Sequence, residues 1–252
     1  MKNEVLTVQE QNHSEINKRR QFLKLSGMAI VGSGLLIACS KDDNSNPPNT
    51  PGVFDLGPGN LGILNYAFAL EQLEAEFYTQ VIAGSYWAGA PANEKQILKD
   101  IYNHEIIHRE FFKTAISAAV SADLVLPTLE FDFSSVDFSS RASVLGTSKV
   151  LEDTGVSAYN GAGKLIDVSD AAGVVYLTVA GKIVSVEARH SSAIRNLLNP
   201  GSMDFAGDDI LIGLLGGAKS FDKATPPADV LAAVVATGFV VTPFTANNLP
   251  TS

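Results

Sequence analysis

Two pairs of residues in this sequence have the types and the spacing of metal ligands. Glu105 and His108 lie three positions apart, and so do Glu187 and His190. Residues three apart on an α-helix lie on the same face, about one turn from each other, so both members of a pair can reach one ion. The two pairs therefore predict two helices that each present a carboxylate and an imidazole to a metal.

An internal repeat adds one glutamate to each pair. Glu71 lies 34 residues before Glu105. In the second half, Glu152 lies 35 residues before Glu187, and a leucine precedes each of the two upstream glutamates. The matching intervals indicate two structurally equivalent halves. The predicted metal ligands are Glu71, Glu105, His108, Glu152, Glu187 and His190.

The charge of this set is the main physical argument for metal ions. Four carboxylates gathered inside a helical bundle are too costly unless cations balance them. The nearby Arg109 and Arg189 supply too little positive charge, whereas two divalent ions balance all four carboxylates. Such a set is also the ligand arrangement of dimetal carboxylate sites in four-helix bundles. Carboxylates with two imidazoles suit both iron and manganese, so the ligand types do not select between these two metals.

Three residues near the predicted ligands have two interpretations each. Glu74 lies on nearly the same helical face as Glu71, so it is either an alternative ligand or a carboxylate beside the site. Tyr78 and Tyr159 each follow an upstream glutamate by seven residues. Each tyrosine either donates a hydrogen bond to a ligand carboxylate or is a half-buried core aromatic.

A zinc-protease motif overlaps the first pair. His104-Glu105-x-x-His108 reads His-Glu-x-x-His, in which the two histidines bind zinc and the glutamate is the general base. The glycine-containing continuation of that motif is missing, and Glu130 is the only nearby carboxylate that could complete a zinc site. The zinc metalloprotease alternative also leaves the ligands of the second half without a role, so we prefer the two-metal interpretation.

Four helices are needed to position these ligands, and hydrophobic periodicity predicts all four. Residues such as Gly84, Pro91 and Pro200 give the start and stop signals. Residues 126–140 alternate apolar and polar side chains, which predicts an extended crossover between the second and third helices. The predicted helices are 61–83, 92–120, 141–166 and 169–198, with a short one near 228–236. These matched lengths predict an all-α four-helix bundle with a long crossover.

The first 38 residues resemble an export signal. Arg19 and Arg20 lie in a basic stretch, 18–24, that precedes an apolar segment too short to span a bilayer. This stretch is similar to the twin-arginine signal, and Leu-Ile-Ala-Cys at 36–39 resembles the lipobox of bacterial lipoproteins. The resemblance implies an exported lipoprotein of the bacterial cell envelope. The mature protein would be anchored to the lipid bilayer through acylated Cys39, on the periplasmic side or the outer surface.

Composition excludes several classes of partner and site. The formal net charge is -9, and removing the leader, which carries +2, leaves -11, so nucleic acid is a poor partner. Cys39 is the only cysteine, which rules out an intrachain disulfide or a cysteine-ligated iron-sulfur cluster. The predicted organisation is a signal at 1–38, a lipidated tether at 39–60, the bundle at 61–199 and a C-terminal extension packed on the bundle at 200–252.

The segment from Leu70 to Tyr78, together with the two Glu-x-x-His pairs, makes residues 61–198 similar to the ferritin-like superfamily. The likeness is to the ferritin-like domain family of secreted and desiccation-related proteins. It implies a ferritin-like bundle with a diiron or dimanganese centre that reacts with peroxide, dioxygen or ferrous iron. Such an oxidoreductase would be of the ferroxidase, peroxidase or manganese-catalase type. The alternative is a non-catalytic envelope protein whose metal ions stabilise the fold.

Overall fold

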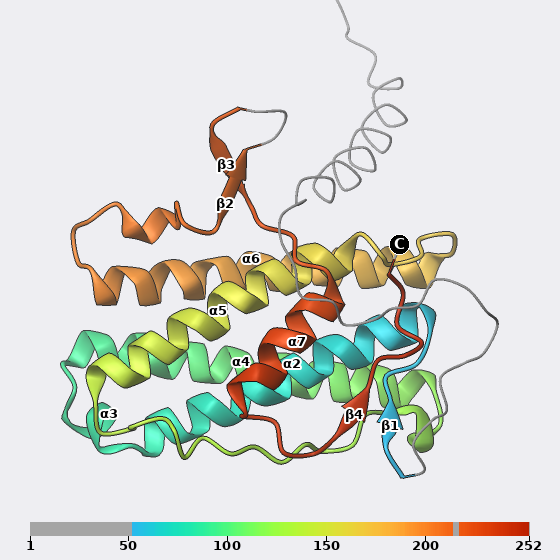
Figure 1. Cartoon of the computed structure of the whole chain (residues 1–252), viewed down its shortest axis with the longest axis horizontal. Coiled ribbons are helices and arrows are strands. Elements are labelled where there is room, and N and C mark those ends of the chain that lie inside the picture. Colours follow the sequence, from blue (N-terminus) through green and yellow to red (C-terminus); the bar gives the residue numbers. More distant parts are fainter. Residues whose placement is uncertain (1–51, 214–216, 252) are drawn as a thin grey trace, which may run out of the picture.

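The computed structural model describes residues 52–213 and 217–251 and forms an all-α four-helix bundle (Figure 1). Its long helices are α2 (Gly59–Ala83), α4 (Ala92–Ala119), α5 (Arg141–Gly163) and α6 (Ala171–Leu198), and the short α3 (Ser85–Gly89) joins α2 to α4. α2 packs along α4 and α5 packs along α6, so the bundle consists of two helical hairpins. The predicted leader and Cys39 lie outside the described residues.

The long crossover connects the two hairpins. After the short 3-10 helix η1 (Ala122–Leu124), the chain runs back along the bundle, so α4 and α5 point in the same direction (Figure 1). Leu129 and Phe133 are buried and Phe131 is partly buried, whereas Glu130 and Asp132 between them are exposed, which explains the alternating pattern of this part of the segment. Asn65 Oδ1 accepts a hydrogen bond of 3.0 Å from the Leu126 N–H, and Gln72 Oε1 accepts one of 2.9 Å from the Leu129 N–H. Buried amides of α2 therefore fasten the crossover to the bundle.

Several predicted helix ends differ from the structure. α2 begins at Gly59 rather than at 61, and α4 ends at Ala119 rather than at 120. α5 ends at Gly163 rather than at residue 166, because Ile166 is buried against the core from outside the helix and so continues the apolar pattern without helical backbone. α6 begins at Ala171 rather than at 169. The Asp170 carboxylate accepts a 2.8 Å hydrogen bond from the Gly173 N–H, which makes Asp170 the N-cap of this helix.

The folded domain begins before the predicted boundary at residue 61. The two-residue strand β1 (Phe54–Asp55) pairs in parallel with β4 (Phe244–Thr245), and Leu56 is fully buried. The Asp55 carboxylate also accepts a 2.7 Å hydrogen bond from the Thr245 hydroxyl, 190 residues later. The end of the predicted tether is thus part of the domain, because Phe54 and Asp55 pair with residues near the C-terminal end of the domain.

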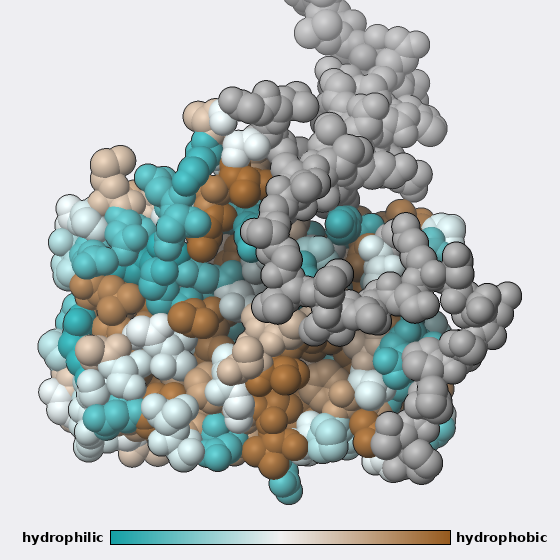
Figure 2. Space-filling model, viewed as in Figure 1, coloured by the Kyte–Doolittle hydropathy of each residue, from teal (hydrophilic) through white to brown (hydrophobic). Residues whose placement is uncertain are grey.

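The C-terminal extension lies against the second hairpin. It contains η2 (Asp204–Ala206), an antiparallel pair of strands, β2 (Leu211–Gly213) and β3 (Lys219–Asp222), and the helix α7 (Pro227–Thr237). Val230 and Val234 of α7 are buried in the core. A Cβ at Gly161 would lie 1.8 Å from the Thr225 carbonyl oxygen, so the glycine allows the extension to approach α5 directly. Apolar side chains gather on the outer surface over α7 and the chain that follows it (Figure 2).

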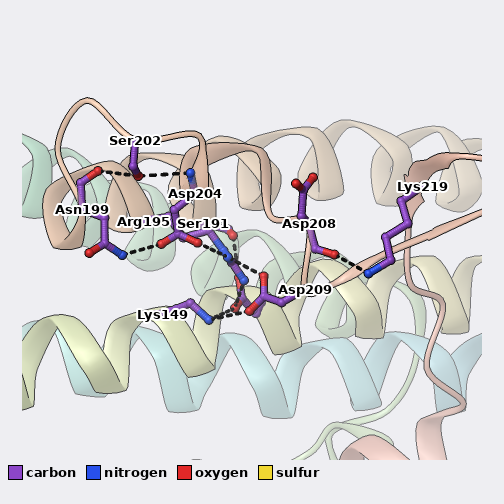
Figure 3. Close-up of polar contacts among 10 residues, drawn as sticks. Lys149, Ser191, Arg195, Asn199, Ser202, Asp204, Asp208, Asp209 and Lys219 are labelled. Carbon is purple, nitrogen blue, oxygen red and sulfur yellow. Dashed lines mark hydrogen bonds and ion pairs between the residues drawn. The ribbon is translucent and has the colours of Figure 1, made fainter.

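A buried arginine fastens the extension to α5 and α6 (Figure 3). Arg195 of α6 is 0% exposed, and its guanidinium lies 2.7 Å from Asp153 Oδ2 and 2.6 Å from Asp209 Oδ1. Asp204 lies 3.3 Å away, and Lys149 lies 3.1 Å from Asp209 Oδ2. Because the partners come from α5 and from the extension, this cluster determines how the extension leaves the end of α6.

Candidate metal centre

The six predicted ligands meet in the middle of the bundle. α2 supplies one glutamate and α5 another, while α4 and α6 each supply a Glu-x-x-His pair. The four glutamates are 0% exposed, and the two histidines are 9% or less exposed. The structure thus brings together Glu71, Glu105, His108, Glu152, Glu187 and His190.

The ligand atoms form two overlapping groups. In each group, one donor atom from each of four residues lies within 4.8 Å of the other three. Glu105 and Glu187 belong to both groups, whereas every other member belongs to one. The first group is completed by Glu71 and His108, and the second by Glu152 and His190. The repeat seen in the sequence is therefore a repeat in space, with the two shared carboxylates between the halves.

Both histidines direct their Nδ1 atoms into the cluster. His108 Nδ1 lies 3.1 Å from Glu187 Oε1 and 3.3 Å from Glu71 Oε2. His190 Nδ1 lies 2.9 Å from Glu105 Oε1 and 3.3 Å from Glu152 Oε2. These are ion-pair distances, but neither Nδ1 atom is aligned for a hydrogen bond, and the facing carboxylate oxygens are buried without a partner. Buried donor atoms that converge without hydrogen bonds fit a cation at their centre.

Without metal ions, protons on the two histidines balance part of the negative charge of the carboxylates. Burial lowers the pKa of His108, but Glu105, Glu187 and Glu71 outweigh it and raise the pKa to about 12. Burial raises the pKa of Glu152 to about 7, against the opposing effect of His190. Burial also acts to raise the pKa of Glu187, but His108 and His190 lower it to about 2. The carboxylates therefore hold both imidazoles in the charged form, which shows how strongly this pocket attracts positive charge.

Two tyrosines link the halves of the cluster. The Tyr78 hydroxyl of α2 donates a hydrogen bond to Glu152 Oε1 of α5, and the Tyr159 hydroxyl of α5 donates one to Glu71 Oε1 of α2. Burial, followed by the neighbouring carboxylate, raises the pKa of each hydroxyl, so both remain donors at neutral pH. Each tyrosine thus positions the glutamate of the opposite half, and of its two interpretations the hydrogen-bonding one describes the geometry.

A fifth carboxylate, Glu74, is buried next to the cluster. It belongs to neither group of four, whereas Glu71 belongs to one, so of these two candidate ligands the geometry favours Glu71. Burial and then Glu187 raise the pKa of Glu74 well above its usual value. The offset of 81 residues that relates Glu71 to Glu152 also relates Glu74 to Gly155. A Cβ at Gly155 would lie 3.2 Å from Glu74 Oε1, so the glycine leaves the space that Glu74 occupies.

His104 lies outside the donor groups but contacts one of their members. Its Nδ1 atom lies 2.8 Å from His190 Nε2, and the two rings are stacked. His104 therefore approaches the side of His190 that faces away from the cluster. The zinc-protease alternative requires His104 and His108 to bind one ion together. Among the described residues, however, His104 belongs to no group of metal-donor atoms with His108. Neither this contact nor the role of Gly155 is visible in the sequence, because both depend on how neighbouring helices face each other.

Comparison with known families agrees with this geometry. A family model described as a ferritin-like domain matches residues 59–200. The matched region contains all four long helices and all six converging residues. A search of curated proteins finds no match.

Proposed function

The chain belongs to the ferritin-like domain family, and from this premise we propose that its buried cluster holds two iron or two manganese ions and catalyses redox chemistry. When bound, such a pair of ions supplies electron transfer to or from a small reactant, here peroxide, dioxygen or ferrous iron. The observation that carries the proposal is the pair of four-donor groups that share Glu105 and Glu187.

Each half of the bundle supplies a terminal pair of ligands. Glu71 and His108 would hold one ion and Glu152 and His190 the other, with Glu105 and Glu187 between them. Two divalent ions would replace the protons that now balance four carboxylates. Glu74 adds a fifth carboxyl next to these ligands, and burial followed by Glu187 raises its pKa in the metal-free cluster.

The surrounding residues keep this set of ligands in place. Tyr78 and Tyr159 fix the terminal glutamates through hydrogen bonds from the opposite hairpin. His104 contacts the outer nitrogen of His190, which helps to orient the ring. Outer contacts of this kind determine how well a ligand is oriented and how tightly it binds a metal.

Metal analysis joined to an activity assay tests the proposal. The purified protein, loaded with iron or manganese, should contain two ions per chain and should consume peroxide or oxidise ferrous iron. His190→Ala should lose at least one ion, whereas Glu110→Gln, an exposed change on α4, should retain both. One zinc ion lost in His104→Ala would instead support the protease alternative, and a chain without stoichiometric metal would contradict both.

A second candidate follows from the closed geometry of the site. The four glutamates are fully buried, so the ions could serve as a structural link between the hairpins in a non-catalytic protein. This function predicts that metal raises the unfolding temperature while peroxide and ferrous iron stay unchanged with either metal. Turnover by the loaded protein would exclude it.

We also propose that the chain is exported and anchored to the cell envelope through acylated Cys39. The support is the twin-arginine stretch at 18–24 and the lipobox at 36–39. Labelled fatty acid should be incorporated by the native chain in bacterial cells, and Cys39→Ser should abolish labelling and release the protein from the membrane fraction. Labelling that persists in Cys39→Ser would contradict the anchor.

A further inference from the structure

One end of the bundle contains an apolar cavity of about 250 Å³. Its wall is formed by the start of α2, the end of α4, the end of α5 with Ile166, and the start of α6. Every residue that lines it is uncharged, and aliphatic and aromatic side chains such as Leu70, Phe112 and Val179 predominate. The cavity therefore offers dispersion contacts on all sides and no ionic group for a charged ligand.

Tyr159 connects this cavity to the metal cluster. Its ring forms part of the wall, and its hydroxyl donates the hydrogen bond to Glu71. Phe112, which also lines the wall, packs near the same ring, with the two ring centres 6.5 Å apart. A molecule in the cavity would thus be one aromatic ring away from a predicted metal ligand.

The cavity reaches the surface between α4 and α6. Phe111 and Val175 both line it, yet they are 42% and 56% exposed, so they mark its mouth. Ile107, one turn before Phe111 on α4, is also exposed, so apolar side chains continue along α4 from the mouth. A rim of this kind favours the uptake of an apolar molecule over a polar one.

An empty hollow of this size is unfavourable in a protein core. Protein interiors are close-packed, and the cost of a cavity rises with its volume. An apolar cavity of about 150 Å³ stays dry and takes up benzene, so this larger one can accommodate a longer molecule. Its wall runs along α2 from Ile63 to Leu70, or about 10 Å at the helical rise, which suits an elongated shape.

We propose that the cavity binds a hydrocarbon chain, with one end against Tyr159 and the other at the mouth between α4 and α6. The chain belongs either to a free alkane or long-chain alcohol, or to the acyl tail of a membrane lipid. Both sources present the same unbranched, uncharged methylene surface to the wall. The site is distinct from the metal cluster and does not require that ions be bound.

Calorimetric titration with decanol tests the site. The full-length chain is used as Cys39→Ser, which cannot be acylated at residue 39. Decanol should bind one molecule per chain with a negative heat-capacity change, the mark of apolar burial, and should raise the unfolding temperature. The titration is run on metal-free and metal-loaded protein. Decanol binding to the metal-free protein therefore tests the cavity even if the proposed metal function is wrong.

Three variants show whether binding occurs in the cavity. Ala115→Phe and Ala180→Phe fill it from α4 and α6, and each should weaken decanol binding at least tenfold. Ala118→Phe adds the same ring to an exposed position of α4 and should leave binding unchanged. If a filled variant fails to fold, the rim variant Val175→Asp, at an exposed position, should weaken binding through its charge.

A second arm of the experiment distinguishes the sources of the chain. The same proteins are incubated with phosphatidylglycerol vesicles and then examined by native mass spectrometry. A bound phospholipid that Ala180→Phe excludes supports the lipid source, and binding of decanol without phospholipid supports the free source. No binding of either probe, or equal binding by the filled variants, would overturn the proposal.

Discussion

At the residue scale, Glu74 and Gly155 hold equivalent positions in the two halves but have opposite roles. The carboxylate of Glu74 fills space that a side chain at Gly155 would need, since a Cβ there would lie 3.2 Å from Glu74 Oε1 and 3.4 Å from Glu187 Oε2. The cluster is therefore symmetric in its six converging residues and asymmetric in this additional acid.

Gly155→Ala should weaken metal binding. The added methyl group crowds Glu74 and comes into contact with Glu187, one of the two shared carboxylates, and changes beside a metal ligand commonly cost about 10–100-fold in affinity. Competition with a chelator measures the effect. Gly146→Ala on the same helix meets no atom within 4 Å and is the matched control, so an equal loss in both variants would contradict this role for Gly155.

Tyr78→Phe and Tyr159→Phe should each reduce metal affinity by about 10–100-fold. Each change removes the hydrogen bond that holds a glutamate of the opposite half, Glu152 or Glu71. Because the two bonds are equivalent, the two losses should be similar, and chelator competition can compare them directly. Tyr102→Phe, at a partly buried position of α4 where the Lys99 ammonium lies over the ring and no cluster carboxylate is bound, should leave affinity unchanged. Two tyrosine variants that bind metal like the native chain would show that the tyrosines serve only as core aromatics.

Some residues of the site could be predicted from the sequence, and others could not. Glu71 and Glu152 could be found because the repeat fixes their interval to a Glu-x-x-His pair. The contact of His104 with His190 could not, because two residues on different helices meet only once the rotation of both helices is known. The same holds for Gly155, whose lack of a side chain has a meaning only opposite Glu74.

At the element scale, the sequence predicts that each long helix is present, but the residues at which the helices begin and end depend on particular contacts. The start of α6 follows from the cap at Asp170, a residue type that serves equally well in turns. The pairing of β1 with β4 joins the two ends of the domain, and two-residue strands carry no periodic signal. Local patterns therefore gave the bundle, and long-range contacts determined its edges.

Arg195→Met should detach the C-terminal extension from the end of α6. The guanidinium is fully buried between Asp153 and Asp209, and removing one partner of such a cluster leaves unbalanced carboxylates at a cost of about 3 kcal/mol. Chemical denaturation measures the change in the free energy of unfolding. Lys149→Met removes a more exposed contact of the same acids and should cost less than about 1 kcal/mol. Similar losses in both variants would contradict a central role for Arg195.

The same cluster predicts an acid-dependent loss of stability. The hydrogen bond from Arg195 lowers the pKa of Asp209 below its usual value. A carboxylate with a folded pKa below its unfolded value of about 3.9 stabilises the fold above that pH. This contribution is lost as the pH falls through the lower folded pKa. The native chain should therefore lose more stability than Arg195→Met when denaturation curves are compared between neutral and strongly acidic pH, and parallel losses would refute the assignment.

At the scale of the whole molecule, the metal cluster is the place where the two hairpins meet. Glu71, Glu105 and His108 come from the first hairpin, and their counterparts come from the second. Without ions, five buried carboxylates face each other across this junction. The fold therefore contains a region that is unfavourable by itself and becomes favourable when cations bind both hairpins.

Glu105→Gln separates these two effects. Burial and then Glu187 raise the pKa of Glu105, so a neutral amide of the same shape should relieve the metal-free protein and raise its stability by about 1 kcal/mol. The same change removes a shared carboxylate and should abolish most of the increase in unfolding temperature that iron or manganese gives to the native chain.

The increase in unfolding temperature that metal gives to the native chain should itself grow with pH. His108, whose pKa is about 12 in the metal-free cluster, must lose a proton before it can bind an ion. Thermal unfolding with metal and with chelator measures all three effects, and Glu110→Gln on the exposed face of α4 is the control. A Glu105→Gln chain that is less stable without metal and equally stabilised with it would show that this carboxylate supports the fold rather than the ions.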